Sequence, residues 1–544
     1  MLAGLMMDSQ LTTNTLMGFA DKVYPTSEIV SITADQGLHR YTYADAFTRC
    51  RQLANALVAS GVTDGDRVAT LAWNDYRHVE LYYGISGIGA VCHTINPRLF
   101  PEQIDYIINH AEDKLLFTDP LFMPLLEQLS DKLTSVEKII VLCDDAYLKP
   151  TSLNNVVSYE SYIGAQSSQF EWPELDEKSA SSLCYTSGTT GNPKGVLYSH
   201  RSTLLHAYAG ALPDSMNMSV RDVVMPIVPM FHANAWSIPY SALMVGAKFV
   251  LPGPKMGDGE TLHKLISSEG VTVSAGVPTV WLALLAHLKK TQQSLTDLKR
   301  VIVGGAACPS SIMDEFVDDH GVDVIHAWGM TETSPLGTVN TLKAGMESLP
   351  PEELSKIRVK QGRPVFGVDF RLIGSDGQEL PWDGKASGEV NVRGPWICSG
   401  YYKLDKTDAH DDEGWLRTGD MATIDADGYM QITDRTKDVI KSGGEWISSI
   451  DLENAAVGHP AVQEAAVIGI PHPKWSERPL LIVIKEAGAA LEGPELLAWL
   501  DDKIAKWWIP DDVVFVDELP HTATGKLSKK DLREQFKDYC LPTR

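Results

Sequence analysis

The sequence predicts an α/β protein with more than one domain, and two observations indicate this. Short apolar segments rich in β-branched residues recur along the chain and alternate with segments of helical periodicity. This alternation is typical of parallel sheets that are covered by helices. The second observation is the length of 544 residues, which exceeds what one hydrophobic core normally supports.

Individual elements are expected from short stretches of sequence. Strands are predicted at 67–73, 138–142, 222–228 and 301–305, and helices at 43–59 and 261–269. Over 367–432 the pattern changes to short strands joined by Gly and Asp turns, which indicates a β-rich subdomain. The charged segment Asp434–Asp438 precedes a new α+β pattern. We therefore expect an N-terminal domain over 1–433, a hinge at 434–437 and a C-terminal domain over 438–544.

Charge and cysteine usage exclude several classes of protein. The formal net charge is −24, so nucleic acid and anionic membranes are disfavoured partners. No stretch approaches the roughly 20 apolar residues that span a bilayer, and no integral membrane segment is expected. The seven cysteines form no Cys-x-x-Cys pair, which argues against a disulfide framework and structural zinc. A reducing, cytoplasmic location is the expectation.

The most informative stretch runs from Tyr185 to Gly195 and reads YTSGTTGNPKG. Glycines let backbone N–H groups approach phosphate oxygens, hydroxyls donate hydrogen bonds, and a lysine adds positive charge. The residues expected to bind phosphate are Thr186, Ser187, Gly188, Thr189, Thr190, Gly191 and Lys194. The stretch is not a P-loop, because its lysine precedes the last glycine. The alternative is a flexible turn without a ligand.

Four later positions carry residues that suit nucleotide chemistry. Glu332 ends the segment HAWGMTE and is a hard oxygen ligand of the kind that Mg²⁺ takes together with substrate phosphates. Asp420 can accept hydrogen bonds from two ribose hydroxyls. Arg435 can contact a ribose or a phosphate, and Lys526 stands on a Gly/Thr turn near the C-terminus. Each residue alone also fits an ordinary role, namely a helix-start charge, a turn, a linker charge or a solvated lysine.

Taken together and in this order, these stretches resemble the adenylate-forming superfamily of acyl-CoA synthetases, luciferases and peptide-synthetase adenylation domains. The resemblance covers nearly the whole chain. The segments Lys437–Ser448, Tyr198–Thr203 and His93–Leu99 look like those of medium- and long-chain fatty-acyl-CoA synthetases, and also like those of 3-methylmercaptopropionate-CoA ligases. Lys437 stands where many relatives carry Asp, which disfavours an acetate or aryl-acid enzyme.

The resemblance implies a large N-terminal domain of two helix-covered sheets plus the β-rich subdomain, and a small mobile C-terminal α+β lid. It implies ATP, Mg²⁺ and coenzyme A. Beside the loop Thr186–Lys194, the nucleotide would be bound by Gly305, Ala306, His326, Ala327, Trp328, Gly329, Met330, Thr331, Asp420 and Arg435, with Lys441, Gly443, Gly444 and Lys526 from the lid. Glu332 would bind Mg²⁺, and Lys526, Glu332 and Thr186 would be catalytic. Family members are often homodimers, although no residue pattern sets the oligomeric state.

The acyl pocket is expected in the segment Pro229–Trp236, which combines aromatic and small residues as an apolar tunnel wall needs. The acid-binding residues would be His232, Trp236, Gly304, Gly305 and Trp446, the last by its match to a gating tryptophan. His232 and Trp236 are equally typical of core residues.

The expected function is a fatty acid–CoA ligase that forms acyl-AMP and then acyl-CoA. The alternatives are a short-chain ligase, such as a 3-methylmercaptopropionate-CoA ligase, a protein that stops at acyl-AMP, and a nucleotide-binding sensor.

Overall fold

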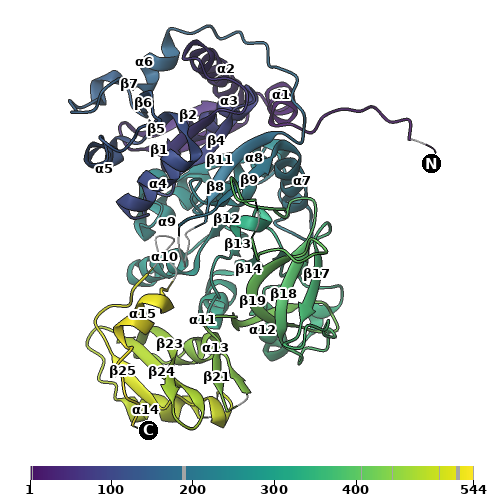
Figure 1. The fold of residues 1–544 in the computed structure, drawn as a ribbon, viewed down its shortest axis with the longest axis vertical. Coiled ribbons are helices and arrows are strands. Elements are labelled where there is room, and N and C mark those ends of the chain that lie inside the picture. The colour runs from purple at the N-terminus through teal and green to yellow at the C-terminus, as the bar shows by residue number, and fades with distance from the viewer. Residues whose placement is uncertain are drawn as a thin grey trace.

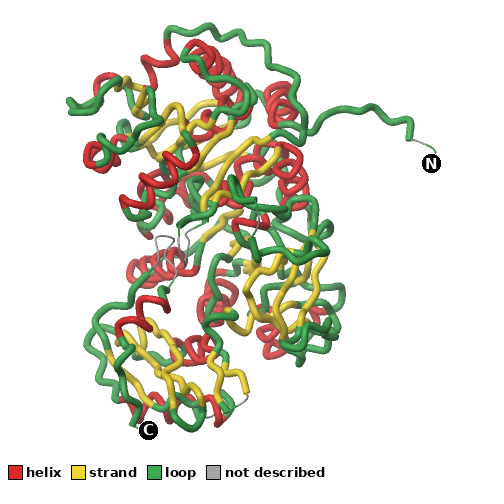
Figure 2. Tube along the Cα trace, in the orientation of Figure 1, coloured by secondary structure: helices red, strands yellow, loops and turns green. Residues whose placement is uncertain are grey.

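The computed structural model describes residues 2, 4–186, 192–405, 407–443, 445–501, 503–521 and 527–542, without the side chains of Glu445 and Trp446. It has two large, mainly parallel sheets, a four-stranded antiparallel sheet and a five-stranded mixed sheet (Figure 1). Figure 2 shows helices packed around the two large sheets, and the mixed sheet with its own helices at the opposite end of the molecule. The predicted α/β class, with a large N-terminal part and a smaller C-terminal part, is confirmed.

The seven-stranded sheet has the order β7-β6-β5-β3-β4-β8-β9, and β9 alone among these strands is antiparallel to its neighbour. Its strands are β3 Arg67–Leu71, β4 Val91–Thr94, β5 Asp113–Thr118, β6 Lys138–Val141, β7 Val156–Ser158, β8 Ala180–Tyr185 and β9 Gly195–Ser199. The predicted phosphate loop therefore joins β8 to the edge strand β9.

The nine-stranded sheet has the order β16-β15-β14-β13-β12-β10-β11-β1-β2, with antiparallel pairs at its two edges and six parallel strands between them. Its strands are β1 Glu28–Thr33, β2 Gly37–Thr42, β10 Val223–Pro226, β11 Lys248–Leu251, β12 Val273–Gly276, β13 Arg300–Val303, β14 Asp323–Trp328, β15 Thr338–Val339 and β16 Arg363–Pro364. All four predicted strands are confirmed, each one slightly shorter than predicted.

A shared layer of helices joins the two large sheets. Four helices contribute to one hydrophobic core that reaches both sheets: α2 Tyr43–Ala59, α3 Tyr76–Gly87, α7 His200–Ala211 and α8 Ile238–Val245. Every residue of α3 is buried, as expected for a helix enclosed on all sides. The outer face of the nine-stranded sheet packs against α9 Gly259–Glu269, α10 Pro278–Thr291 and α11 Ser310–Asp314. The outer face of the seven-stranded sheet packs against α4 Pro101–Ala111 and α5 Met123–Gln128.

The remaining helices of this part are α1 Thr13–Val23, α6 Tyr159–Gly164 and α12 Pro351–Arg358. Helix ends follow local sequence. Thr42 caps α2 through a reciprocal capping box with Asp45, and Asp258 caps α9, which ends at Gly270 with a φ of +67°. None of the helices in the described part of the chain combines the length and the apolar character that a membrane crossing needs.

The antiparallel sheet occupies the region in which the sequence predicts short strands. Its strands are β17 Asp369–Ile373, β18 Gly388–Arg393, β19 Leu416–Ile424 and β20 Met430–Arg435. The mixed sheet and its helices follow, with β21 Ile440–Ser442, β22 Glu445–Ile447, β23 Val462–His472, β24 Ser476–Lys485, β25 Asp512–Phe515, α13 Ser449–Val457, α14 Gly493–Leu500 and α15 Lys529–Gln535. These C-terminal elements have hydrophobic cores of their own.

A buried ion network ties α3 to the surrounding loops. The guanidinium of Arg77, which is 1% exposed, donates to both carboxylate oxygens of Asp35 at 3.0 Å. It also donates to Glu160 at 2.9 Å and to the carbonyl of Leu142 at 3.0 Å. Removing one partner of such a network leaves buried charge uncompensated, so the network constrains the fold more than surface ion pairs do.

We predict that Arg77→Met lowers the free energy of unfolding by about 3–5 kcal/mol, because the carboxylate of Asp35 loses its bidentate partner inside the protein. Chemical denaturation followed by circular dichroism measures this. The matched control is Arg393→Met, whose ion pair with Asp369 is exposed on both sides, and its expected change is below about 1 kcal/mol. Equal effects of the two substitutions would contradict the prediction.

Candidate active site

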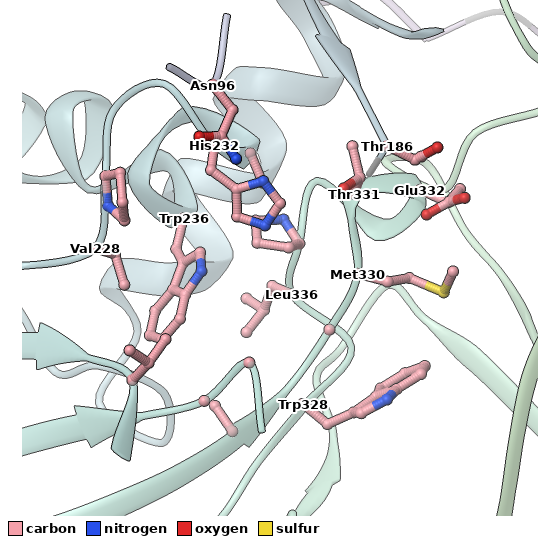
Figure 3. A pocket seen from close by; sticks show the side chains of 18 of the residues that line it. Asn96, Thr186, Val228, His232, Trp236, Trp328, Met330, Thr331, Glu332 and Leu336 are labelled. Atoms are coloured by element: carbon pink, nitrogen blue, oxygen red, sulfur yellow. The ribbon is translucent and has the colours of Figure 1, made fainter. Parts of the chain in front are cut away.

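A cavity of about 340 Å³ lies where the parallel strands of both large sheets end. Its lining includes residues that follow six of these strands, namely Asn96 and Arg98 after β4, Thr186 after β8, Ile227 after β10, Val277 after β12, Gly304 and Gly305 after β13, and Gly329 after β14. The carboxyl ends of parallel strands are the usual place for ligand sites in α/β proteins. In Figure 3, Thr186, Thr331 and Glu332 lie at one end of this cavity, and Trp236 and Val228, with His232 and Asn96 near them, lie at the other.

The phosphate-loop residues that the structure describes line the cavity. They are Thr186, Asn192 and Lys194. The N–H of Thr186 donates to the carbonyl of Lys194 at 2.9 Å, which closes the base of the loop. The ammonium of Lys194 lies 5.0 Å from the centre of the Tyr401 ring. The other predicted phosphate ligands, Ser187, Gly188, Thr189, Thr190 and Gly191, lie outside the described residues.

Glu332 lies at the same end of the cavity as Thr186 and Thr331 (Figure 3). Glu332 is 7% exposed. The hydroxyl of Tyr401 donates to Oε1 of Glu332 at 2.8 Å. Burial and the charge of Glu332 raise the pKa of Tyr401, so its hydroxyl stays protonated. Tyr198 donates to the carbonyl of Thr331 at 2.7 Å. The carboxylate is therefore held in a defined orientation at the cavity wall.

The predicted ribose ligands contact each other. The guanidinium of Arg435 lies 2.6 Å from Oδ1 of Asp420, in neighbouring strands β20 and β19. The other oxygen of Asp420 accepts from the indole N–H of Trp328 at 2.8 Å. Arg435 and Trp328 line the cavity, whereas Asp420 is 2% exposed behind them. The three residues form one chain of contacts at the edge of the cavity.

The predicted nucleotide-binding residues between Gly305 and Thr331 divide into two groups. Gly305, Ala327, Trp328, Gly329, Met330 and Thr331 line the cavity. The ring of His326 instead hydrogen-bonds the carbonyl of Val359 at 3.0 Å and is buried, because neighbouring side chains of a strand alternate between the two faces of a sheet. Burial lowers the pKa of His326 to about 4, so the ring is neutral. Ala306 is not part of the lining.

The apolar wall contains a strained turn. Five consecutive residues without glycine, Ala233–Ser237, have φ between +43° and +57°. Left-handed backbone costs roughly 1–2 kcal/mol per residue that carries a Cβ, so other contacts must hold this turn. The turn presents Trp236 to the cavity, and the indole approaches the Cα of Gly304 so closely that an added Cβ would lie 3.1 Å from the ring. Val228, His232 and Leu336 line the same wall (Figure 3).

Two buried asparagines hold the segment that carries this wall. Asn234 donates to Ser182 at 2.8 Å and accepts from the thiol of Cys184 at 3.4 Å, so the turn is tied to strand β8. Asn74 donates to the carbonyls of Pro226 and Val228 and accepts from the N–H of Met230 at 2.7 Å. The seven-stranded sheet and its loops thereby set the position of a wall that belongs to the nine-stranded sheet.

Of the predicted site residues of the C-terminal part, the structure describes Lys441 and Gly443, and these two do not line the cavity. Lys441 is exposed, and Gly443 lies in the β21–β22 hairpin, where its N–H donates to the carbonyl of Trp475 at 2.8 Å. Lys526, Gly444 and the side chain of Trp446 lie outside the described residues. Their predicted roles stay predictions.

Some lining residues were not selected from the sequence. Arg98 is exposed within the cleft, its guanidinium lies 5.7 Å from the Trp73 ring, and no carboxylate among the described residues pairs with it. Desolvation by the surrounding protein lowers its pKa. Tyr401, which donates a hydrogen bond to Glu332, is another lining residue that was not selected from the sequence. The segment His93–Leu99 contains Arg98, but only the fold shows that this segment reaches the cavity.

Comparison with known proteins agrees with this geometry. Residues 19–402 match the model of the AMP-binding enzyme family, and residues 451–526 match that of the AMP-binding enzyme C-terminal domain. The chain is 50% identical to a 3-methylmercaptopropionyl-CoA ligase of Ruegeria lacuscaerulensis, with 99% of both chains covered. It is 49% identical to a medium-chain-fatty-acid–CoA ligase of Ectopseudomonas oleovorans, with 99% of this chain and 98% of the relative covered.

A solved structure supports the same assignment. The anthranilate CoA ligase AuaEII in complex with anthranoyl-AMP superposes with a TM-score of 0.86 at 26% identity, and 97% of each chain is covered. The family model alone matches more than half of the chain, and the relatives cover nearly all of it. The chain therefore belongs to the AMP-binding enzyme family.

Proposed function

We propose that this protein is an AMP-forming acid–CoA ligase that acts on a medium- or long-chain carboxylic acid. The observation that carries the proposal is the cavity, where phosphate-loop residues, the carboxylate of Glu332 and the apolar wall around Trp236 face one space. A polar end suits a nucleotide polyphosphate and an apolar end suits an acyl chain. The named relatives, which are CoA ligases of a medium-chain fatty acid and of a short thioether acid, support the reaction class.

The first step is adenylation of the acid. A carboxylate oxygen of the acid attacks the α-phosphorus of ATP, the bond to the β-phosphate oxygen breaks, and pyrophosphate leaves. The acid is already ionised at neutral pH, so no general base is required. Two anions must meet, and the task of the protein is to neutralise and position them. Lys194 and the loop 186–194 would hold the leaving pyrophosphate, and Lys526 would bridge the carboxylate and the α-phosphate.

The residues present fit a magnesium ion. Among the described residues, no cluster of three or more potential ligand side chains exists, so a metal here would need phosphate oxygens to complete its shell. Mg²⁺ is commonly bound in this way, by one or two carboxylates plus substrate phosphates. Glu332 supplies such a carboxylate at the polar end of the cavity. The ion would supply positive charge to the leaving phosphates, and Tyr401 would keep Glu332 oriented toward it.

The second step is attack of the CoA thiol on the acyl carbon of the mixed anhydride, with release of AMP. We propose that the domain boundary at 434–437 is a hinge that withdraws Lys526 and brings Gly443 and Gly444 to the cavity. Contacts at the start of this segment hold the two parts together in this structure and would have to break for the rotation. The carboxylate of Asp434 accepts from the backbone N–H of Ser449 at 2.7 Å and also from its hydroxyl at 2.6 Å, which fixes α13 of the C-terminal part against β20.

We also propose that Arg98, in addition to Lys194, binds a phosphate group of a substrate. It lies in the cleft, it is accessible, and no carboxylate among the described residues neutralises it. A guanidinium of this kind is suited to bidentate contact with a phosphate group, which either ATP or CoA supplies.

The length of the acyl chain is the finer part of the proposal. Each additional buried CH₂ contributes roughly 0.8 kcal/mol to binding, so the preference depends on where the apolar part of the cavity ends. A 3-methylmercaptopropionate-CoA ligase is the second candidate, because the relative with that name is 50% identical over 99% of the chain.

The function is tested with the purified protein, MgATP, CoA and a panel of acids that includes octanoate and 3-(methylthio)propanoate. We expect acid-dependent pyrophosphate release with equal loss of free thiol. Pyrophosphate release without thiol loss would indicate a protein that stops at acyl-AMP. Absence of both with every acid would leave nucleotide binding alone and would overturn the proposal.

A Lys526→Ala enzyme should lose adenylation but still convert supplied acyl-AMP and CoA to acyl-CoA, because the lysine acts only where two anions meet. Pyrophosphate exchange measures the first half-reaction and thiol loss measures the second. The matched control is Lys530→Ala, an exposed lysine for which both rates should equal those of the wild type. Equal loss of both half-reactions in Lys526→Ala would refute this division of roles.

Substitution Glu332→Gln should lower kcat/KM for MgATP by roughly 10²–10³, because the amide keeps the size of the side chain but is uncharged, so it cannot neutralise the cation and is a weaker ligand. Tyr401→Phe removes only one hydrogen bond to the same carboxylate and should cost about tenfold or less. Initial rates at varied Mg²⁺ measure both. A Glu332→Gln enzyme with wild-type rates at low Mg²⁺ would contradict the assigned role.

A further inference from the structure

Both ends of the phosphate loop rest on an aromatic side chain that lies outside the cavity. Tyr185 is the last residue of β8, and its ring packs in the core between the seven-stranded sheet and α4. The next residue, Thr186, lines the cavity, whereas Tyr185 is not part of the lining. Gly195 begins β9 at the other end of the loop and pairs with Tyr185. A Cβ added to Gly195 would lie 3.2 Å from the Tyr185 ring, so this end of the loop also lies close against the ring.

The hydroxyl of Tyr185 is hydrogen-bonded to a histidine of α4. It lies 2.7 Å from Nδ1 of His110, in the last turn of that helix. Burial raises the pKa of the Tyr185 phenol, so the hydroxyl keeps its proton. Burial also lowers the pKa of His110, so the imidazole is neutral at pH 7. A neutral imidazole has one acceptor nitrogen, and we assign that role to Nδ1, which accepts from the hydroxyl.

Two consecutive tyrosines connect this cluster to Glu332. The backbone N–H of Tyr402 donates to the carbonyl of Gly195 at 2.8 Å, and its ring meets the ring of His110 edge-on with centroids 5.9 Å apart. Tyr401, the preceding residue, donates through its hydroxyl to the carboxylate of Glu332. The base of the phosphate loop and the carboxylate at the polar end of the cavity are therefore held by contacts of one short segment.

We propose that Tyr185 and His110 are positioning residues for the adenylation step, and that their hydrogen bond fixes the base of the phosphate loop against α4. The inference rests on the proposed ligase function. Neither side chain lines the cavity, so both act through the loop and through Lys194 within it. The loop would hold the pyrophosphate, which leaves in the first step and is absent from the second. Loss of the hydrogen bond therefore impairs the use of MgATP and spares the attack of CoA on acyl-AMP.

The substitution Tyr185→Phe tests this, because it removes the hydroxyl and keeps the ring. The KM for MgATP should rise by about three- to tenfold, which corresponds to the loss of one hydrogen bond. The KM for the acid and the rate of acyl-CoA formation from supplied acyl-AMP should stay at the wild-type values. Pyrophosphate exchange and thiol loss measure the two half-reactions. The matched control is Tyr106→Phe, which removes a hydroxyl from a ring stacked on His110 and should leave every parameter unchanged.

A double-mutant cycle separates positioning from general damage to the fold. His110→Ala removes the acceptor and should reproduce the effect of Tyr185→Phe, whereas His110→Asn keeps an acceptor oxygen close to the place of Nδ1 and should restore part of the loss. The double variant Tyr185→Phe/His110→Ala should be no worse than the worse single variant, since both substitutions remove the same bond.

The failure of this inference is distinguishable from the failure of the ligase proposal. If the wild type activates no acid, the ligase proposal itself fails. If the wild type is active, the positioning role is overturned by a Tyr185→Phe enzyme that keeps the wild-type KM for MgATP or loses both half-reactions equally. Fold-changes of the two single variants that multiply in the double variant would also overturn it. The ratio of the two half-reactions is informative even where stability falls, because both are measured on the same enzyme.

Discussion

The site depends on one constraint, which is that two parallel sheets share a layer of helices and so open their carboxyl-end loops toward a common space. Parallel strands all point the same way, and the segments that leave them meet at one edge. In this chain six such segments line one cavity, and they come from positions as far apart as Asn96 and Gly329. The fully buried helix α3 and the network of Arg77 hold the shared layer in place. A shift of one sheet against the other would separate the phosphate loop from the acyl wall.

The charged side chains at this edge of the sheets are mostly positive, whereas the chain as a whole is negative. The protein carries a formal net charge of −24, yet the described Arg, Lys, Asp and Glu residues that line the cavity are Arg98, Lys194, Arg417, Arg435 and one carboxylate, Glu332. A low-dielectric cleft of one sign attracts ligands of the other. The proposed substrates, an acid, a nucleotide and CoA, are all anions, so the local excess of cations would offset the repulsion from the negatively charged surface. Glu332 is the exception that suits a divalent metal.

In the apolar wall, hydrogen bonds from buried side chains offset the strain of the backbone. A turn of five left-handed residues is unfavourable by itself, and Asn234 and Asn74 offset that cost with hydrogen bonds to β8 and to the loop after β10. The two asparagines thus hold the backbone of the wall in place.

Local sequence determined the elements and the chemistry of the motifs. The helix at 43–59 begins and ends as its capping residues and periodicity predict, and the strands at 67–73 and 301–305 follow from their apolar runs. The loop YTSGTTGNPKG and Glu332 predicted a nucleotide site because their residue types suit phosphate and metal chemistry, and the structure places Thr186, Lys194 and Glu332 on one cavity. Prediction was weakest where a residue acts through a distant partner. His326 was expected to bind the nucleotide, but the strand turns its ring toward Val359.

Only the tertiary structure decided which residues share the cavity. Asp420 contacts Arg435 and Trp328, and Tyr401 supports Glu332, across segments that are separate in sequence. Likewise, only the fold exposes Arg98 in the cleft. Propensity and periodicity are local properties, and they carry no information on which loop faces which. That is set when two sheets pack on one helical layer, because the packing fixes the register between them.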